Sequence, residues 1–366
     1  MNVRKVSIKD YKKIQLLFKR NNLKILSFKR WKDLWSKNPY FKNKKKDWIK
    51  GWVLEYKSNI VGHFGSFPTY YNLNEKLYKC SVLYGWVVDR KFRSFSILLL
   101  KKIFNQLNAD FFLGSTTNIK AGRIMESLKS KKIPLNQLSY TSFIILDLKK
   151  TLEFFFKKKK FKINKMFLNF FQYIISILFK KKLNSWSTKF DESNIFKCKK
   201  IDNKFNLIWK KIKRKHKNLL LLQRDKLSLN WRLNYFLKEN KAWIFFSYNK
   251  KKINGYAICV ENQSSRNSLK KAFLIDLIPL EEDKNISINL IGASIKEAKK
   301  RNCDIFEFKV FDKAQKPVIS FFNPFERKLL NNPFYYKSNN EKLGKMLNKE
   351  KYWIPAYIDG DSIVNF

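Results

Sequence analysis

The stretch GWVVDRKFRSFS, residues 85–96, decides the fold prediction. It closes the apolar run 76–88, which reads as a strand, and from Ser94 onward apolar residues recur at helical spacing. A strand that turns directly into a helix presents free N–H groups at the helix N-terminus, where an anion can bind. Arg93 adds positive charge, so this turn predicts a phosphate-binding site.

The runs on either side of this turn have the periods of an α/β domain. Strands are predicted at 51–56, 60–73, 76–88, 110–114 and 139–146, and a helix at about 119–128. The closely spaced strands before the turn indicate an antiparallel meander, and the helices after it indicate parallel neighbours. We therefore expect a mixed, largely antiparallel sheet, with 139–146 as its closing strand.

This order of elements resembles the GNAT acyl-CoA N-acyltransferase superfamily. In that family the fourth strand carries a bulge that opens a V-shaped cleft, the pantetheine of acyl-CoA pairs with the exposed strand edge, and the next turn holds the pyrophosphate. A second segment, Asn118-Ile119-Lys120-Ala121, resembles the family's Asn-x-x-Ala motif. The resemblance implies that acetyl-CoA or another acyl-CoA contacts Trp86, Val87, Val88, Arg93, Ser94, Phe95, Ser96, Asn118 and Ala121.

Two positions depart from the family pattern. The turn has Ser94 and Ser96 where glycines are usual, and Met125 stands where a Tyr often protonates the departing thiolate. Methionine has no proton to donate, so the thiolate leaves without an acid, another residue supplies the proton, or this domain no longer catalyses. In the alternative structural interpretation, Ser94 and Asn118 simply cap their helices.

Transfer to an amine requires a base within reach of the acceptor. His63 is the strongest candidate because it titrates near neutral pH and is one of only 2 histidines. Asp89 is a second candidate base, and Tyr84 is a candidate proton donor, as is Tyr140. The turn Asp359-Gly360-Asp361 pairs two carboxylates that could hold an amine, although this sequence also forms ordinary turns.

The chain is predicted to contain two GNAT-like domains joined by a helical insertion. Residues 1–150 form the acyl-CoA-binding domain, 151–194 a basic and hydrophobic connector, and 195–366 a second, degenerate GNAT-like domain. In the second domain Glu281-Glu282-Asp283 precedes the corresponding helix and would repel phosphate. The arrangement resembles bacterial two-domain acyltransferase-like and Fem-type proteins.

The formal net charge is +49, from 78 Lys and Arg against 29 Asp and Glu. This excess either marks a binding surface for polyanions or reflects a coding bias toward lysine that is spread over the surface. Met166–Phe179 is almost wholly apolar between two lysine runs, but is too short to cross a bilayer. It is either a helix at a membrane interface or a buried linker helix. We expect 151–182 to contact an anionic membrane surface.

The 4 cysteines are scattered without a metal-ligand spacing, so no metal is expected, and their number fits the reducing cytoplasm. The N-terminus lacks the apolar core of a signal peptide, which predicts a cytoplasmic protein. The basic and apolar segment 151–182 would place it peripherally on the inner face of the membrane.

The predicted function is acyl-CoA-dependent N-acyl transfer, with acetyl as the expected acyl group, to an amine. The resemblance to the family implies an acceptor such as an amino sugar in cell-surface polysaccharide biosynthesis. The alternatives are a Fem-like transferase that uses aminoacyl-tRNA, and a non-catalytic scaffold that binds nucleic acid or anionic lipid.

Overall fold

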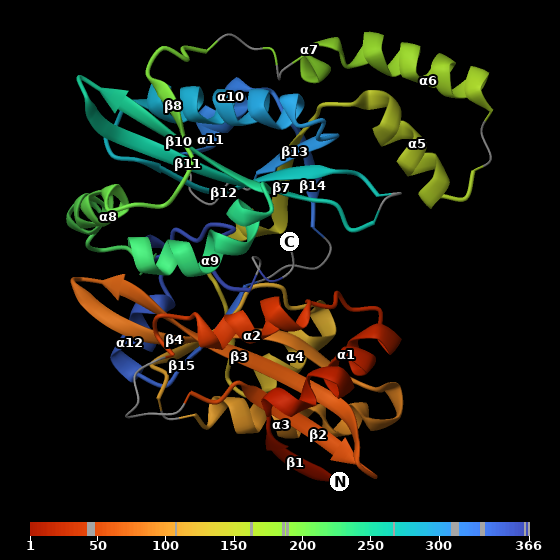
Figure 1. Ribbon diagram of the computed structural model, residues 1–366, viewed down its shortest axis with the longest axis vertical. Coiled ribbons are helices and arrows are strands. Elements are labelled where there is room, and N and C mark those ends of the chain that lie inside the picture. Colours follow the sequence, from red (N-terminus) through yellow and green to blue (C-terminus); the bar gives the residue numbers. More distant parts are fainter. Residues whose placement is uncertain are drawn as a thin grey trace. The chain divides into compact units, whose positions relative to one another are not determined.

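The computed structural model describes residues 1–41, 48–106, 108–161, 164–184, 187, 190–265, 268–308, 315–329, 334–361 and 364 (Figure 1). The chain forms two compact units, and each takes segments from distant parts of the sequence. Unit 1 comprises Met1–Asn136, Asp202–Arg232 and Leu330–Asn365, and unit 2 comprises Gln137–Ile201, Leu233–Leu329 and Phe366.

Unit 1 is built on one mixed sheet. Its strand order is β1 (Asn2–Lys5), β2 (Gly51–Tyr56), β3 (Asn59–Leu73), β4 (Lys76–Val88), β5 (Phe111–Gly114), β15 (Tyr335–Ser338) and β6 (Lys131–Lys132), and β9 (Leu221–Leu222) pairs with β3. Strands β4 and β5 are parallel, and the other pairs recorded for this sheet are antiparallel. A strand from the C-terminal part of the chain is therefore built into the N-terminal sheet.

The helices of unit 1 are α1 (Tyr11–Arg20), α2 (Phe28–Ser36), α3 (Ser96–Phe104), α4 (Ile119–Ser127), α8 (Lys204–Lys215) and α12 (Glu341–Leu347), with short 3-10 turns at Ile8–Asp10, Arg90–Phe95 and Glu350–Tyr352. A further 3-10 turn, Asn136–Ser139, begins at the boundary with unit 2. Helices α1, α3 and α12 pack against strands of the sheet. In α3 the side chains of Leu99, Leu100 and Ile103 are fully buried at i, i+1 and i+4. They pack against Leu54 of β2 and Phe64 of β3, which fixes α3 on these two strands.

Unit 2 contains the second mixed sheet. The strand order is β14 (Phe325–Lys328), β7 (Tyr140–Ile145), β13 (Ile305–Phe308), β12 (Lys271–Pro279), β11 (Lys252–Asn262), β10 (Ala242–Asn249) and β8 (Ile195–Cys198). The helix α10 (Lys284–Lys300) buries Leu290, Ile291 and Ile295 against this sheet, and α11 (Lys316–Phe321) packs beside it. The helix α9 (Lys226–Lys238) begins in unit 1 and ends in unit 2.

The predicted fold class is confirmed: both sheets are mixed and largely antiparallel, and helices accompany both. One pairing prediction is wrong. The strand expected at 139–146 does not close the first sheet, because β7 pairs with β13 and β14 in unit 2. The first sheet is instead continued by β15, which pairs with β5 and β6.

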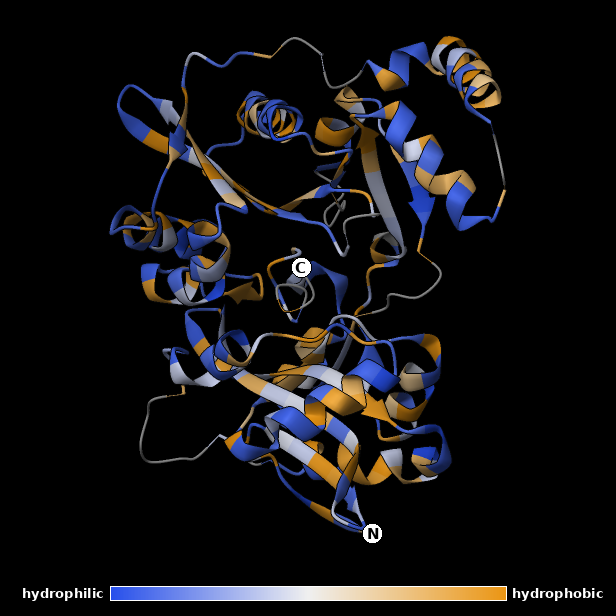
Figure 2. Cartoon of the chain, turned by 45° about the vertical axis from the view of Figure 1, so that its right-hand side comes forward, coloured by the Kyte–Doolittle hydropathy of each residue, from blue (hydrophilic) through white to orange (hydrophobic). Residues whose placement is uncertain are grey.

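The predicted connector is not a link between two consecutive domains. Its helices α5 (Leu148–Lys158), α6 (Lys165–Leu178) and α7 (Lys180–Leu183) lie between β7 and β8, two strands of the same sheet, so they are an insertion within unit 2. The compact units consequently differ from the predicted boundaries at 150 and 194. Figure 2 shows hydrophobic residues along α6. Residues 162, 163, 185, 186, 188 and 189 of the predicted connector lie outside the described residues. Within the described chain, no helix has the length and apolarity needed to cross a membrane.

Candidate functional site

Strands β4 and β5 separate after three paired residues. Cys80, Ser81 and Val82 pair with β5, whereas β4 continues to Val88 and β5 ends at Gly114. The split coincides with a bulge, since β4 has one residue more than β3 between the pairs His63–Val87 and Gly65–Tyr84. The bulge therefore lies where the parallel pairing of β4 with β5 has already ended.

The bulge depends on Gly85. Its φ of +59° lies in the left-handed region, and a Cβ at this position would be 2.7 Å from Cζ of Phe18. Its carbonyl oxygen is 2.8 Å from Nδ1 of His63. Because a carbonyl only accepts, the His63 proton lies on Nδ1, which donates this hydrogen bond. The histidine therefore fixes the backbone at the bulge.

His63 itself is completely buried. Burial lowers its pKa to about 4, although the hydrogen bond to Gly85 acts in the opposite direction, so the ring is neutral near pH 7. Its Nε2 has no hydrogen-bond partner among the described residues. His63 is not among the residues that line the neighbouring cavity.

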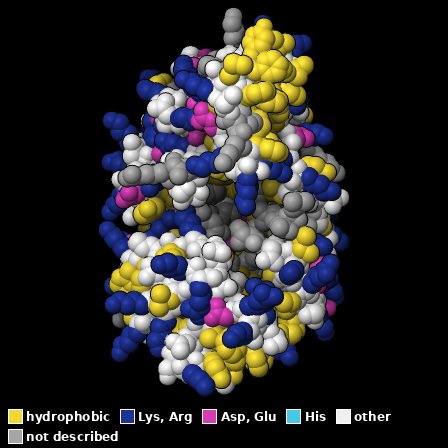
Figure 3. Space-filling view, turned by 90° about the vertical axis from the view of Figure 1, so that its right-hand side faces the viewer, with side chains coloured by type: hydrophobic (Ala, Val, Ile, Leu, Met, Phe, Trp, Pro, Cys, Tyr) yellow, Lys and Arg dark blue, Asp and Glu magenta, His cyan; other side chains and the backbone are white. Residues whose placement is uncertain are grey.

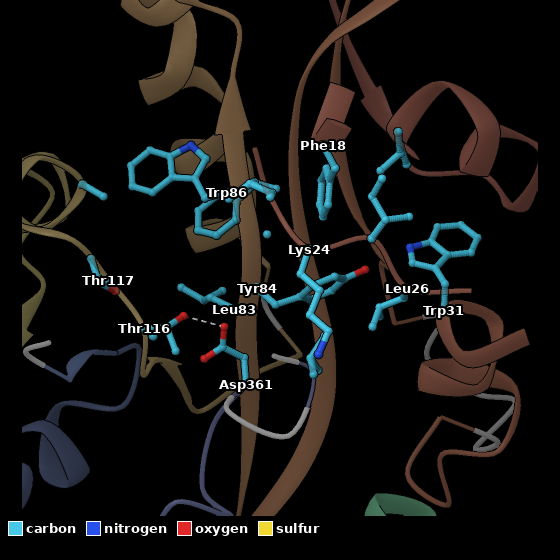
Figure 4. Close-up of a pocket in the computed structure, with 18 of the residues that line it drawn as sticks. Phe18, Lys24, Leu26, Trp31, Leu83, Tyr84, Trp86, Thr116, Thr117 and Asp361 are labelled. Atoms are coloured by element: carbon cyan, nitrogen blue, oxygen red, sulfur yellow. Dashed lines mark hydrogen bonds between the residues drawn. The ribbon is translucent and has the colours of Figure 1, made fainter. Parts of the chain in front are cut away.

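A cavity of about 200 Å³ opens beside the split, and all of its lining residues belong to unit 1 (Figure 4). Most of the lining is aromatic or aliphatic: Tyr11, Ile14, Phe18, Leu23, Ile25, Leu26, Trp31, Phe64, Leu83, Tyr84, Trp86, Ala121, Met125 and Val364. The polar side chains are Gln15, Lys24, Thr116, Thr117, Asn118 and Asp361. Few convergent polar groups in an apolar cavity are typical of a small-molecule site.

Asp361 is the carboxylate of this lining. It lies in the C-terminal segment, and its Oδ2 accepts a hydrogen bond of 2.7 Å from the Thr116 hydroxyl, which Figure 4 marks with a dashed line. Its Oδ1 accepts a second from the Ser115 hydroxyl. Its backbone N–H also donates to Ser115 Oγ at 2.9 Å. These contacts hold the carboxylate at the end of β5.

The C-terminal segment reaches the cavity because buried groups of unit 1 hold it. The Arg232 guanidinium, which is 3% exposed, donates to the carbonyl of Ile358 at 3.1 Å and to the Thr69 hydroxyl at 2.8 Å. Gly360 has a φ of +73°, and a Cβ there would collide with the Ser115 hydroxyl. Only glycine allows the chain to bring Asp361 this close to Ser115.

The predicted phosphate turn has the expected position but a different local structure. Residues Arg90–Phe95 form a 3-10 turn, and α3 follows with Phe95 as its N-cap and no side-chain cap. Ser94 is therefore not the cap of α3, contrary to the alternative interpretation. Arg93 and Ser94 are exposed on this turn, while Ser96 begins α3.

Asp89, the second candidate base, is bound in an ion pair. Arg20 contacts its carboxylate at 2.6 Å, and the Asn21 amide donates to it at 2.8 Å. Burial alone would raise the pKa of Asp89, but these two partners bring it below its usual value. A carboxylate stabilised in this way is a poor proton acceptor, and its contacts join α1 to the end of β4.

Asn118 had two interpretations, a helix cap and a residue that contacts a ligand. Asn118 caps α4, since its Oδ1 accepts a hydrogen bond of 2.9 Å from the N–H of Ala121, and both residues line the cavity. Met125 is buried and also lines the cavity, with its sulfur 3.8 Å from the Thr117 hydroxyl. Tyr84 lines the opposite side, and burial raises the pKa of its hydroxyl, which keeps it protonated.

The structure thus brings Tyr84, Trp86, Asn118 and Ala121 together around one cavity. Val87 and Val88 continue β4 beyond the bulge, and Tyr140 lies on β7 of unit 2. Sequence reasoning did not find the residues that position Asp361, since nothing in their local patterns connects them to residue 361. Among the described residues, no group of three or more His, Cys, Asp or Glu side chains could hold a metal ion.

Comparisons with known proteins were made for the sequence and for the fold. No family model and no curated protein matches the sequence. A probable N-acyltransferase from Enterococcus faecalis is similar in structure at 10% identity, with a TM-score of 0.57 over 93% of this chain and 72% of that one. Saccharomyces cerevisiae N-myristoyltransferase with bound myristoyl-CoA has 15% identity and a TM-score of 0.59, over 92% and 79%.

A GCN5-related N-acetyltransferase from Anabaena variabilis has 8% identity and a TM-score of 0.53, over 92% of this chain and 72% of that one. These similarities extend over both units, and the identities are low enough that they concern the fold. The chain therefore has the two-domain fold of the GNAT-type N-acyltransferases.

Proposed function

We propose that this chain is an acyl-CoA-dependent N-acyltransferase. The observation that carries the proposal is the split between β4 and β5, which opens beside a cavity lined by Asp361. The edge of β4 past Val82 offers backbone groups to the two amides of pantetheine. The thioester then extends toward the cavity, where a carboxylate can receive the proton of an acceptor amine.

The reaction needs few groups from the chain. Asp361 takes a proton from the acceptor amine, and the nitrogen attacks the thioester carbonyl carbon; the C–N bond forms as the C–S bond breaks. The departing thiolate then takes up a proton. Tyr84 is the protonated hydroxyl of the lining and has the chemistry of the donor that Met125 lacks.

His63 and Asp89 have other tasks in this proposal. His63 keeps the bulge in place through the Gly85 carbonyl, and Asp89 ties α1 to the end of β4 through Arg20. Both are therefore positioning residues, and Asp361 is the catalytic base. The exposed Arg93 and the start of α3 supply the charge and the free N–H groups for the pyrophosphate.

The acceptor is an amine that fits a mostly apolar cavity. Trp31, Tyr11 and Leu26 line it on the side of α1 and α2, where an aromatic or aliphatic acceptor gains from burial. A sugar ring could also stack on Trp31, so an amino sugar is a candidate acceptor. A role in polysaccharide assembly would follow from that acceptor.

The proposal is tested by titrating the purified chain with acetyl-CoA, myristoyl-CoA and free CoA by calorimetry, at about 50 and about 300 mM salt. Saturable one-site binding that persists at the higher salt supports it, and the acyl chain with the higher affinity defines the donor. The loss of all binding at the higher salt would refute it. That result would favour a charged scaffold or an aminoacyl-tRNA donor.

A further inference from the structure

Helix α6 presents large apolar side chains to solvent. Met166, Phe170, Tyr173 and Ile177 are 76%, 57%, 66% and 56% exposed. Their spacing of i, i+4, i+7 and i+11 places them in one stripe along the helix. A stripe at this spacing usually faces a protein core, but here nothing in the described chain covers it.

A second exposed stripe runs beside the first. Phe167, Phe171 and Leu178 follow the same spacing one position later and are 56%, 38% and 69% exposed. Leu168 is the buried residue of the helix, and the rings of Phe156 in α5 and Phe171 lie 5.6 Å apart. Few side chains of α6, among them Leu168 and Phe171, therefore face the rest of the chain, while most of its apolar side chains are exposed to solvent (Figure 3).

The ends of this hairpin of α5 and α6 are strongly basic. Lys157 and Lys158 are the last residues of α5, and Lys159 and Lys160 follow it. Lys180–Lys182 begin α7, and a single residue separates them from the end of α6. No Asp or Glu occurs from Phe154 to Phe190. The apolar face is thus bordered by positive charge at both ends, and Glu153 in α5 is the acidic residue of the hairpin.

The 14 residues of α6 rise about 21 Å, against the 30 Å of a bilayer core. A helix of this length, with its apolar face along one side, can lie parallel to the membrane surface. Aromatic rings then enter the boundary between headgroups and acyl chains, while lysines at the helix ends reach the phosphates.

Two other partners fit less well. A second copy of the chain would bring the same lysine runs face to face, and like charges oppose such an interface. An RNA partner would use the lysines and could stack bases on Phe170 and Tyr173, but it gains little from the aliphatic side chains of Met166, Ile177 and Leu178. A bilayer uses the whole apolar face together with the lysines.

We propose that the α5–α6 hairpin docks this protein on the surface of a bilayer rich in anionic lipids, with α6 lying in the interface. The docking rests on apolar contact and charge in combination. It is independent of acyl transfer, since it involves none of the residues that line the cavity in unit 1.

The test measures co-sedimentation with vesicles of phosphatidylcholine and phosphatidylglycerol at a ratio of about 7:3, and with pure phosphatidylcholine. The full-length chain should bind the anionic vesicles at least tenfold more tightly. The variant Phe170→Ser/Tyr173→Ser/Ile177→Ser should lose at least tenfold. The control Leu207→Ser/Leu227→Ser, which alters equally exposed leucines of α8 and α9, should bind like the unmodified chain.

Charge is tested in the same assay. Lys180→Gln/Lys181→Gln/Lys182→Gln should weaken binding to the anionic vesicles, whereas Lys210→Gln/Lys211→Gln/Arg214→Gln, which removes equal charge from α8, should not. Equal losses in both variants, or unchanged binding by the serine variant, would overturn the proposal, because binding would then reflect net charge alone. Absence of vesicle binding would overturn it as well.

Insertion is measured with a fluorophore that reports polarity, attached to Met166→Cys in a Cys198→Ala background. The remaining cysteines, Cys80, Cys259 and Cys303, are buried and should not react. A blue shift on anionic vesicles supports docking by α6. A blue shift that appears without lipid and grows with protein concentration would instead assign the face to self-association, and a shift caused by RNA but not by vesicles would assign it to RNA.

Discussion

The two sheets split at corresponding places. In unit 1, β4 pairs with β5 over Cys80–Val82, and in unit 2, β12 pairs with β13 over Lys271–Phe273; these are the parallel pairs of the described sheets. Both inner strands carry one extra residue just beyond the parallel segment, and a helix follows each of them. The split, the bulge and the helix that follows them are therefore present in both units.

The side chains at the two splits differ. The first bulge has Gly85 in the left-handed region beside the neutral His63, whereas Ile275 forms the second beside Ile258 and Cys259. Next to it the buried Asp276 accepts a hydrogen bond from the Tyr256 hydroxyl.

The turns that follow also differ in charge. Arg90, Lys91 and Arg93 precede α3, while Glu281, Glu282 and Asp283 precede α10, and Asp283 caps it. The turn after the first split is basic and the turn after the second is acidic, so only the first has the charge that a phosphate would require. Single substitutions in the two units can test this comparison.

The largest effect should come from Asp361→Asn. An amide preserves the shape and can still contact Ser115 and Thr116, but it cannot take a proton, so turnover should fall by roughly 10²- to 10⁴-fold with acyl-CoA affinity unchanged. Release of free CoA thiol measures turnover. Glu281→Gln, an equal change in unit 2, should leave turnover intact, and a similar loss in both variants would remove Asp361 from the mechanism.

His63 should make stability dependent on pH. Burial lowers its pKa from 6.5 to about 4, so the unfolded chain binds a proton first as the pH falls. Its contribution is complete above pH 6.5 and is lost between pH 6.5 and 4, which costs roughly 2 kcal/mol between pH 7 and 4.5. Urea unfolding should show a shallower pH slope for His63→Asn; equal slopes would contradict the buried neutral state.

Gly85→Ala should destabilise unit 1. The left-handed φ is unfavourable for alanine, and its Cβ would press on Phe18, so the free energy of unfolding should fall by roughly 1–2 kcal/mol. Gly344→Ala in α12 is the matched control, since its Cβ would meet no atom closer than 3.4 Å. Thermal unfolding compares the two variants, and equal melting temperatures would show that the bulge does not need glycine.

Much of the fold was predictable because local periodicity determines the elements. The strand at 51–56, the strand at 76–88 and the helix that follows β4 were found within a few residues. Pairing was not predictable for β7, because its apolar pattern suits either sheet equally. A strand of six residues does not encode which of two similar edges it joins.

The candidate site shows the same limit. Trp86 and Asn118 were named from motifs beside the split, and both line the cavity. Asp359 and Asp361 had two interpretations from the sequence, a carboxylate pair that could hold an amine and an ordinary turn. The place of Asp361 in the cavity could not be predicted, because it depends on Arg232 and Gly360, which hold the C-terminal segment over a large distance in sequence. His63 was chosen for its ordinary pKa, and only the structure shows the burial that lowers it.

The smallest effect is expected for the charge difference between the turn before α3 and the turn before α10. Arg93→Ala removes one exposed cation before α3 and should weaken acyl-CoA binding about fivefold, near 1 kcal/mol, because a solvated ion pair contributes little. Lys284→Ala removes one cation at the start of α10 and should change nothing. Calorimetry at low salt resolves this difference. If both variants bind less tightly to the same extent, acyl-CoA responds to the overall charge of the chain, and the turn before α3 is no more a phosphate site than its acidic counterpart.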